Sequence, residues 1–173
     1  MATLRKITLH PLSIKDLDEV LGIERNSFRT PWTKYAFIHE IQFEKSVFKV
    51  LKIDGRLVGY GGFWYILDEA HISNIAIRPD YRGQGLGKIL LLHLLEEAVA
   101  KGARKATLEV RRSNIIAQDM YSSFGFKIVS VRKNYYSDEH EDALIMWNEN
   151  IAASAAAVRE RHSNAKPISE SSA

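Results

Sequence analysis

The chain has 173 residues, of which 46% are hydrophobic, and a formal net charge of +3. This length is close to the usual size of one domain and is sufficient for one hydrophobic core. The lack of cysteine excludes disulfides, thiolate catalysis and thiolate metal sites. The small charge, without a dense Lys/Arg block, does not favour a dedicated nucleic-acid surface, so we expect no direct nucleic-acid partner.

We expect neither a metal site nor a membrane segment. The six histidines lack the spacing of metal ligands. No stretch reaches the ~18 consecutive apolar residues of a membrane helix, and Met1 to Lys6 contain no apolar core of a secretory signal. These features predict a cytoplasmic protein.

The first half of the chain alternates helices with strands. Ile7–Leu9 predicts a strand, Ser13 caps a helix that runs to about Asn26, and a second helix runs from about Thr33 to Phe43. Three strands follow, the first two joined by the turn signal Asp54-Gly55: Val47–Ile53, Leu57–Tyr65 and Ala70–Ile77.

The second half begins with a leucine-rich helix from Leu86 to Lys101, which Gly102 ends. A strand at Lys105–Val110 precedes a short helix capped by Ser113 or Asn114 and ended by Gly125. The last expected strands are Phe126–Val131 and Ala143–Trp147.

This order predicts an α/β (α+β) domain over residues 1–151, a mixed and mostly antiparallel sheet with helices on both faces. From residue 152 the composition shifts to alanine and serine, so residues 152–173 are expected to be a disordered tail or a frayed helix.

The glycine-rich segment Arg82-Gly83-Gln84-Gly85-Leu86-Gly87 lies between a predicted strand and a predicted helix. Alternate glycines let a ligand approach the backbone, and the helix start offers free N–H groups to an anion. The spacing matches neither the P-loop nor G-x-G-x-x-G. The segment therefore predicts a phosphate-binding loop, although a purely structural β-to-α turn has the same composition.

The pattern formed by Arg82, Gly85 and Gly87 resembles the pyrophosphate loop of acetyltransferases of the GNAT superfamily. Further motifs extend the resemblance over most of residues 70–147. These motifs are Asn74 to Tyr81, Leu108 to Arg111, Ser113-Asn114, Tyr121, Gly125-Phe126, Arg132 to Tyr136 and Glu141 to Ala143. This set resembles the ribosomal-protein-alanine N-acetyltransferase family, the RimI type.

The resemblance implies that acetyl-CoA is the co-substrate and that backbone groups bind much of it. The strand residues Ile75, Ala76 and Ile77 would pair with the pantetheine arm. The pyrophosphate would bind at Arg82, Gly83, Gln84, Gly85, Leu86, Gly87 and Lys88. Asn114 matches a cofactor-contacting position, although an asparagine at a helix start is more often only a cap.

The resemblance also implies two catalytic residues. Strand alternation turns Glu109 away from the face on which Leu108 and Val110 pack. The family match implies that Glu109 is the general base. Without that match, the residues alone favour a solvent-exposed carboxylate paired with an arginine. Tyr121 falls on an apolar helix stripe and would otherwise be assigned to the core, and the family match makes it the acid that donates to the departing thiolate.

The implied reaction is direct attack by the α-amine of a protein N-terminus, such as an alanine of a ribosomal protein, in a ternary complex. Five residues of two loops would flank the peptide entrance, or would instead anchor the surface: Phe28, Pro31, Trp32, Tyr135 and Tyr136. Two other functions stay open, namely acetylation of lysine or a small-molecule amine, and acyl-CoA binding without catalysis.

Overall fold

The structure is a computed structural model that describes residues 5–164 and 170–172. Its helices are α1 (Leu17–Ser27), α2 (Lys34–Gln42), α3 (Leu86–Ala100), α4 (Ile115–Ser123) and α5 (Ile151–Asn164). Its strands are β1 (Ile7–Pro11), β2 (Ser46–Ile53), β3 (Arg56–Ile66), β4 (Glu69–Ile77), β5 (Lys105–Arg111), β6 (Lys127–Tyr136), β7 (Glu141–Asn148) and β8 (Glu170–Ser172). Short 3₁₀ turns at Ile14–Asp16 and Pro79–Tyr81 precede α1 and follow β4.

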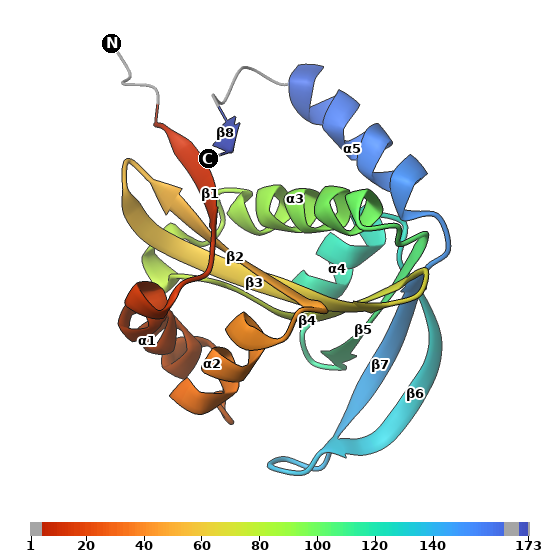
Figure 1. The fold of residues 1–173 in the computed structure, drawn as a ribbon. Helices are drawn as coiled ribbons and strands as arrows, with labels where there is room; N and C mark the ends of the chain where they lie inside the picture. The colour runs from red at the N-terminus through yellow and green to blue at the C-terminus, as the bar shows by residue number, and fades with distance from the viewer. Residues whose placement is uncertain (1–4, 165–169, 173) are drawn as a thin grey trace.

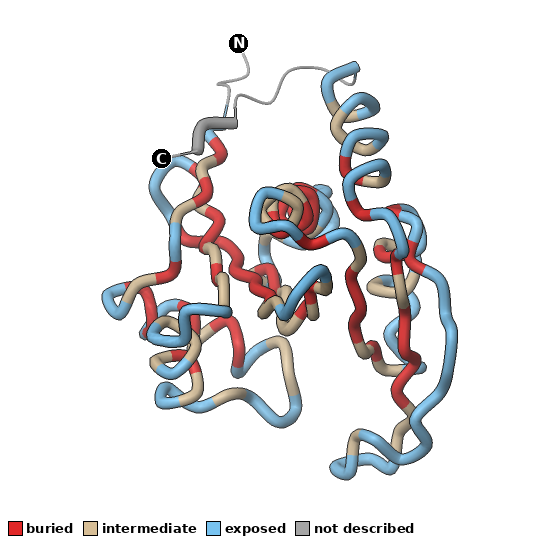
Figure 2. The backbone as a smooth tube through the Cα atoms, turned by 45° about the vertical axis from the view of Figure 1, so that its right-hand side comes forward, coloured by how far each residue is buried: buried red, intermediate tan, exposed pale blue. Residues whose placement is uncertain are grey.

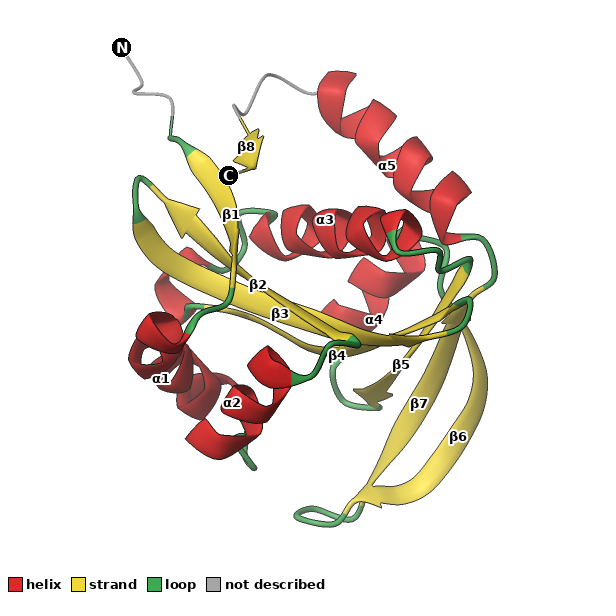
Figure 3. Cartoon of the chain, viewed as in Figure 1, coloured by secondary structure: helices red, strands yellow, loops and turns green. Residues whose placement is uncertain are grey.

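All strands join one sheet in the order β6-β7-β5-β4-β3-β2-β1-β8. Neighbouring strands are antiparallel except for β4 with β5 and β1 with β8. Helices α1 and α2 cover one face, and α3, α4 and α5 lie on the other (Figures 1 and 3). The predicted mixed, mostly antiparallel sheet with helices on both faces is confirmed.

Each face has its own hydrophobic core. The α3 side is built on the leucines of α3, with Phe63 and Phe126 buried beside them. The α1–α2 side is smaller and centres on Phe37 and Tyr60, whose rings meet edge to face at 5.6 Å. Figure 2 shows α3 as a mostly buried helix, while β6 is exposed along nearly all its length.

The structure corrects two boundaries. Strand β6 continues past the expected end at Val131 to Tyr136, because backbone pairing with β7 holds it although its side chains face solvent. The segment from residue 152, expected to be a disordered tail or a frayed helix, is instead a packed helix over residues 152–164, which lie in α5. Ala155 is buried, Val158 contacts the core, and Arg159 makes two hydrogen bonds to Glu96 of α3. The remainder of the expected tail lies largely outside the described residues.

Among the described residues, no helix combines the length and the apolar character needed to cross a bilayer.

Candidate active site

Strands β4 and β5 run side by side for only three residue pairs, from Glu69 with Lys105 to His71 with Thr107. Both strands then continue, β4 to Ile77 and β5 to Arg111, without pairing to each other. The two central strands therefore diverge, and over its second half the side of β4 that faces away from β3 has no strand partner among the described residues.

The backbone of Ile75 and Ile77 faces this opening. The amide of Arg78 donates to the carbonyl of Val58 across the β3–β4 ladder at 2.8 Å. Since amide and carbonyl groups alternate in direction along an antiparallel strand, those of Ile75 and Ile77 point away from β3. Their side chains lie on the α3 face, while Ala76 is buried on the α1–α2 face.

The glycine loop has the geometry that an anion site requires. Gly83 and Gly85 have φ of 77° and 79°, and a Cβ at either position would meet no atom within 4 Å. Gly85 is the N-cap of α3, so the free N–H groups of the first helical turn open toward the loop. The loop residues are exposed except for buried Leu86 and partly buried Gly87, where a Cβ would lie 3.2 Å from Met120 Sδ of α4. These features fit the pyrophosphate of coenzyme A.

Two polar residues of the loop make bonds that stabilise it. Arg82 donates through Nε to the carbonyl of Ile77 at 2.9 Å and through Nη2 to Ser27 Oγ at 3.0 Å. Gln84 Oε1 accepts a hydrogen bond from Arg5 at 3.1 Å. Arg82 therefore ties the loop to the end of β4 and to the end of α1.

Glu109 lies on β5 and points to the α1–α2 side of the sheet, as the alternation predicted, with Leu108 and Val110 buried on the opposite side. Its Oε2 lies 2.7 Å from His71 Nε2. The hydrogen bond from His71 holds the pKa of Glu109 below its ordinary value, against the effect of partial burial. The side chain is 18% exposed, so the carboxylate is accessible from the opening.

An irregularity in β4 brings His71 to this face. Gly61 pairs with Ile75 and Phe63 with Ile72, so Gly62 is opposite both Ser73 and Asn74. A bulge of this kind adds one residue to a strand, so side chains on its two sides no longer follow one common alternation. His71 and Asn74 consequently both point to the α1–α2 side, and the indole of Trp64 stacks on the His71 ring at 4.9 Å.

Tyr121 lies on α4, on the α3 side of the sheet, and is 8% exposed. Burial, and secondarily the proximity of Tyr136, raises its pKa above the ordinary value. Its hydroxyl therefore stays protonated throughout the physiological range and acts as a hydrogen-bond donor. Burial also raises the pKa of Tyr136 to about 12, and the charge of Glu109 adds to the rise.

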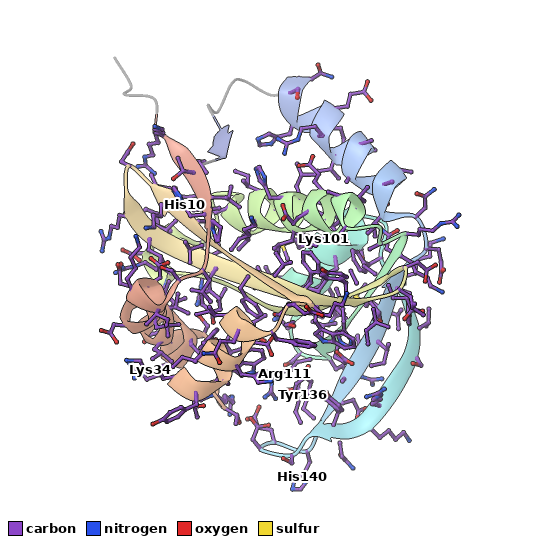
Figure 4. All side chains as sticks on the ribbon, in the orientation of Figure 1. His10, Lys34, Lys101, Arg111, Tyr136 and His140 are labelled. Carbon is purple, nitrogen blue, oxygen red and sulfur yellow. The ribbon has the colours of Figure 1, made fainter. Side chains whose placement is uncertain are left out.

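A cluster of charges holds the β6–β7 turn beside the opening. The Arg111 guanidinium stacks on the Tyr136 ring at 4.0 Å (Figure 4) and binds Asp138 at 2.9 Å and Glu141 at 3.3 Å. Across the opening, Thr30 donates to Asp138 at 3.2 Å, and Arg29 forms an ion pair with Glu139. The two loops predicted to flank the peptide entrance are thus directly bridged.

Of the five predicted entrance residues, the structure brings Tyr135 and Tyr136 together, with their rings perpendicular at 5.1 Å. Tyr135 is exposed and Tyr136 partly buried. Phe28 and Trp32 pack partly against the α1–α2 core, while Pro31 is exposed. Phe28 and Trp32 therefore contribute to packing as well as to the loop surface.

Asn114 is the N-cap of α4, and its side chain accepts a hydrogen bond from the amide of Ala117 at 3.1 Å. Ser113 instead donates its amide to Glu141 Oε1 at 2.8 Å. The choice between the two caps is thereby resolved in favour of Asn114, and its predicted contact with the cofactor stays a prediction.

Sequence reasoning missed Glu24, a fully buried carboxylate on α1. It accepts hydrogen bonds from the Trp32 amide at 2.8 Å and from the Tyr60 hydroxyl, and Asn74 Nδ2 lies 3.4 Å away. Burial raises the pKa of Glu24. Its only sequence signal was a charged residue among the apolar positions Leu17, Val20 and Leu21 of the predicted helix.

Within the described part of the chain, no three His, Asp or Glu side chains form a cluster that could hold a metal ion.

Comparison with known proteins agrees with this geometry. The model of the acetyltransferase (GNAT) family matches residues 17–126. The [ribosomal protein bS18]-alanine N-acetyltransferase of Escherichia coli is 38% identical over 141 residues, which cover 80% of this chain and 95% of that protein. A Bacillus subtilis protein that carries the same name provisionally is 46% identical over 82% of this chain and 95% of its own length.

Solved structures show the same relationship. The crystal structure of the Escherichia coli ribosomal-protein-S18-alanine N-acetyltransferase superposes with a TM-score of 0.75, covering 82% of this chain and 92% of that one. Ard1 from Thermoplasma volcanium, at 29% identity, gives a TM-score of 0.76 over 82% of this chain and 96% of that one. The chain therefore belongs to the acetyltransferase (GNAT) family and, within it, to the ribosomal-protein-alanine N-acetyltransferases.

Proposed function

We propose that this protein transfers the acetyl group of acetyl-CoA to the α-amine of an N-terminal alanine, with ribosomal protein bS18 as the physiological substrate. The substrate comes from the names of its relatives in Escherichia coli and Bacillus subtilis. Since the target is a ribosomal protein, we assign the reaction to the cytoplasm. The observation that carries the proposal is the Glu109–His71 pair, which lies beside the divergence of β4 and β5.

The anion loop and β4 would hold the co-substrate. The amides of Gly83 to Lys88 bind the pyrophosphate, and the outward backbone groups of Ile75 and Ile77 pair with the pantetheine arm. Acetyl-CoA supplies an activated acetyl thioester. The outward amides of β4 also provide donors for the oxyanion that develops when this carbonyl is attacked.

Glu109 would accept a proton from the α-ammonium group, directly or through a water molecule, and so free the neutral amine that attacks the thioester. An α-amine has a pKa of about 7.7 to 8.0 against about 10.4 for lysine, so the neutral nucleophile costs roughly 3 to 4 kcal/mol less to form at neutral pH. A carboxylate with a lowered pKa is a weak base, which suits an α-amine better than a lysine. His71 positions the carboxylate through their hydrogen bond.

Tyr121 would donate a hydrogen bond to the departing sulfur. Its raised pKa keeps the hydroxyl protonated but makes it a weaker acid than an ordinary phenol. Tyr121 therefore stabilises the thiolate by hydrogen bonding, and proton transfer is completed as the product leaves.

A peptide that begins with alanine and contains one internal lysine tests the proposal. After incubation with acetyl-CoA and the enzyme, fragmentation mass spectrometry locates the acetyl group. We expect it on the α-amine, with release of one free thiol per peptide, and Glu109→Gln as the matched control. Acetyl on the lysine alone would indicate a lysine acetyltransferase, and binding without thiol release would indicate a non-catalytic module.

A further inference from the structure

A pocket of about 490 Å³ lies between α3, α4 and α5. Gly85 and Lys88, which also belong to the glycine loop, form one side of it, and Arg161 of α5 forms another. Leu92 and Val158 provide apolar lining from α3 and α5. The pocket is therefore continuous with the anion loop at its α3 end.

The charges of this pocket are of one sign. Lys88 and Arg161 are both exposed cations, and none of the described residues that line it is acidic. Arg161 Nη2 lies 3.5 Å from the carbonyl of Ser123 at the end of α4. That long contact leaves most of the five guanidinium donors available to an anion.

A second pocket, of about 460 Å³, lies on the other side of the loop and has a different character. Its charged residues are of both signs, Arg5 and Arg56 with Asp54 and Asp80. Arg5 already binds Gln84, and Arg56 stacks on Tyr81 at 5.6 Å. An anion would gain little net attraction there, so the pocket at α5 is the better phosphate site.

The position of the pocket beside the glycine loop indicates which part of coenzyme A it would bind. In coenzyme A the 3′-phosphate is carried by the same ribose that bears the pyrophosphate at its 5′ carbon. A pyrophosphate on the glycine loop therefore brings the ribose, its phosphate and the adenine close to the residues that follow Gly85. Two cations suit the phosphate dianion, and the apolar walls suit the faces of a purine.

We propose that α5 completes the coenzyme A site, with Lys88 and Arg161 binding the 3′-phosphate of the adenosine end. The Escherichia coli relative aligns over 80% of this chain but over 95% of its own length, so this chain has residues beyond that relative. Helix α5 begins at Ile151 and so follows residue 126, where the match to the family model ends. The inference rests on the proposed use of acetyl-CoA and assigns to α5 a part in selecting that molecule.

Calorimetric titration of the full chain with coenzyme A and with 3′-dephospho-coenzyme A tests this proposal. We expect Arg161→Gln to weaken coenzyme A binding about tenfold, the effect of one charge-assisted hydrogen bond, and to leave 3′-dephospho-coenzyme A binding unchanged. Lys15→Gln is the matched control. It removes an exposed cation from the turn before α1, on the opposite face of the sheet, and it should alter neither affinity by more than about twofold.

The outcomes separate this inference from the proposed function. If Arg161→Gln binds both ligands as the parent does, or loses both equally, α5 does not recognise the 3′-phosphate. If Lys15→Gln reproduces the selective loss, the effect is one of net charge and the assignment of Arg161 is overturned. If the parent binds neither ligand, the proposed function itself fails.

Discussion

The two halves of the site are built from different parts of the chain. The proposed cofactor half would use backbone groups from the end of β4 and from the loop before α3, all within one short stretch of sequence. The proposed amine half would use side chains of His71 on β4, Glu109 on β5 and Tyr136 on β6, which the sheet brings together. Substitutions should therefore affect the cofactor half through backbone shape and the amine half through proton transfer.

The largest effect is expected in the cofactor half. Gly85→Val places a β-branched side chain at φ 79°, where L-residues are strained, and adds bulk at the start of α3, where a Cβ would meet no atom within 4 Å. The parent should gain about 2.7 kcal/mol of stability at a hundredfold excess of acetyl-CoA over its dissociation constant. The variant should gain none, as measured by thermal unfolding with and without ligand.

Gly102→Val is the matched control for that variant. Gly102 has φ 95°, and a Cβ there would also meet no atom within 4 Å, but this glycine follows the far end of α3. It should lose stability through the same backbone strain and keep its response to acetyl-CoA. Equal responses in both variants would show that the anion does not bind at the Gly85 loop.

A smaller effect is expected in the amine half. His71→Ala removes the hydrogen bond that lowers the pKa of Glu109, so that pKa should rise, as followed by NMR titration of the carboxyl carbon. Turnover should fall about tenfold, equivalent to ~1.4 kcal/mol for one hydrogen bond to a charged group. Trp64→Leu removes the stacking partner and keeps the hydrogen bond, so an equal pKa change there would contradict the role of His71.

The smallest expected effect is on the pH dependence of folding stability, through Glu24 and Glu109. Burial raises the pKa of Glu24 above 4.5, so its stabilising contribution is complete below pH 4.5 and is lost as pH rises through the folded-state pKa. The pKa of Glu109 is lowered from 4.5, so its contribution is present above that pH and is lost as pH falls through the folded-state pKa.

Denaturant unfolding between pH 3 and 8 measures both contributions. Relative to the parent, Glu24→Gln should become more stable as pH rises, and Glu109→Gln less stable. Slopes of the same sign would mean that the two carboxylates do not occupy opposite environments.

The same contrast explains what the sequence could predict. The glycine loop, the leucine helix and the Asp54-Gly55 turn depend on local spacing, and all are present as expected. The Glu24 and His71 contacts depend on the bulge at Ser73 and Asn74 and on the placement of α1 over β4, which local pattern does not encode. Helix α5 was expected to be a tail or a frayed helix because its sequence is rich in alanine, and its docking depends on contacts with distant residues, among them the Arg159–Glu96 pair.

We propose that the two faces of the sheet act on different steps, with Glu109 acting on the amine and Tyr121 on the leaving sulfur. Steady-state pH profiles of Glu109→Gln and Tyr121→Phe on a peptide that begins with alanine test it most directly. Glu109→Gln should lower turnover by about 10² to 10⁴ at pH 7, and the loss should shrink as pH rises because the amine then deprotonates unaided. The defect of Tyr121→Phe should persist at high pH, because the donor to sulfur is absent whatever the state of the amine. Unimpaired turnover of Glu109→Gln at pH 7, or the same pH dependence in both variants, would contradict this division of roles.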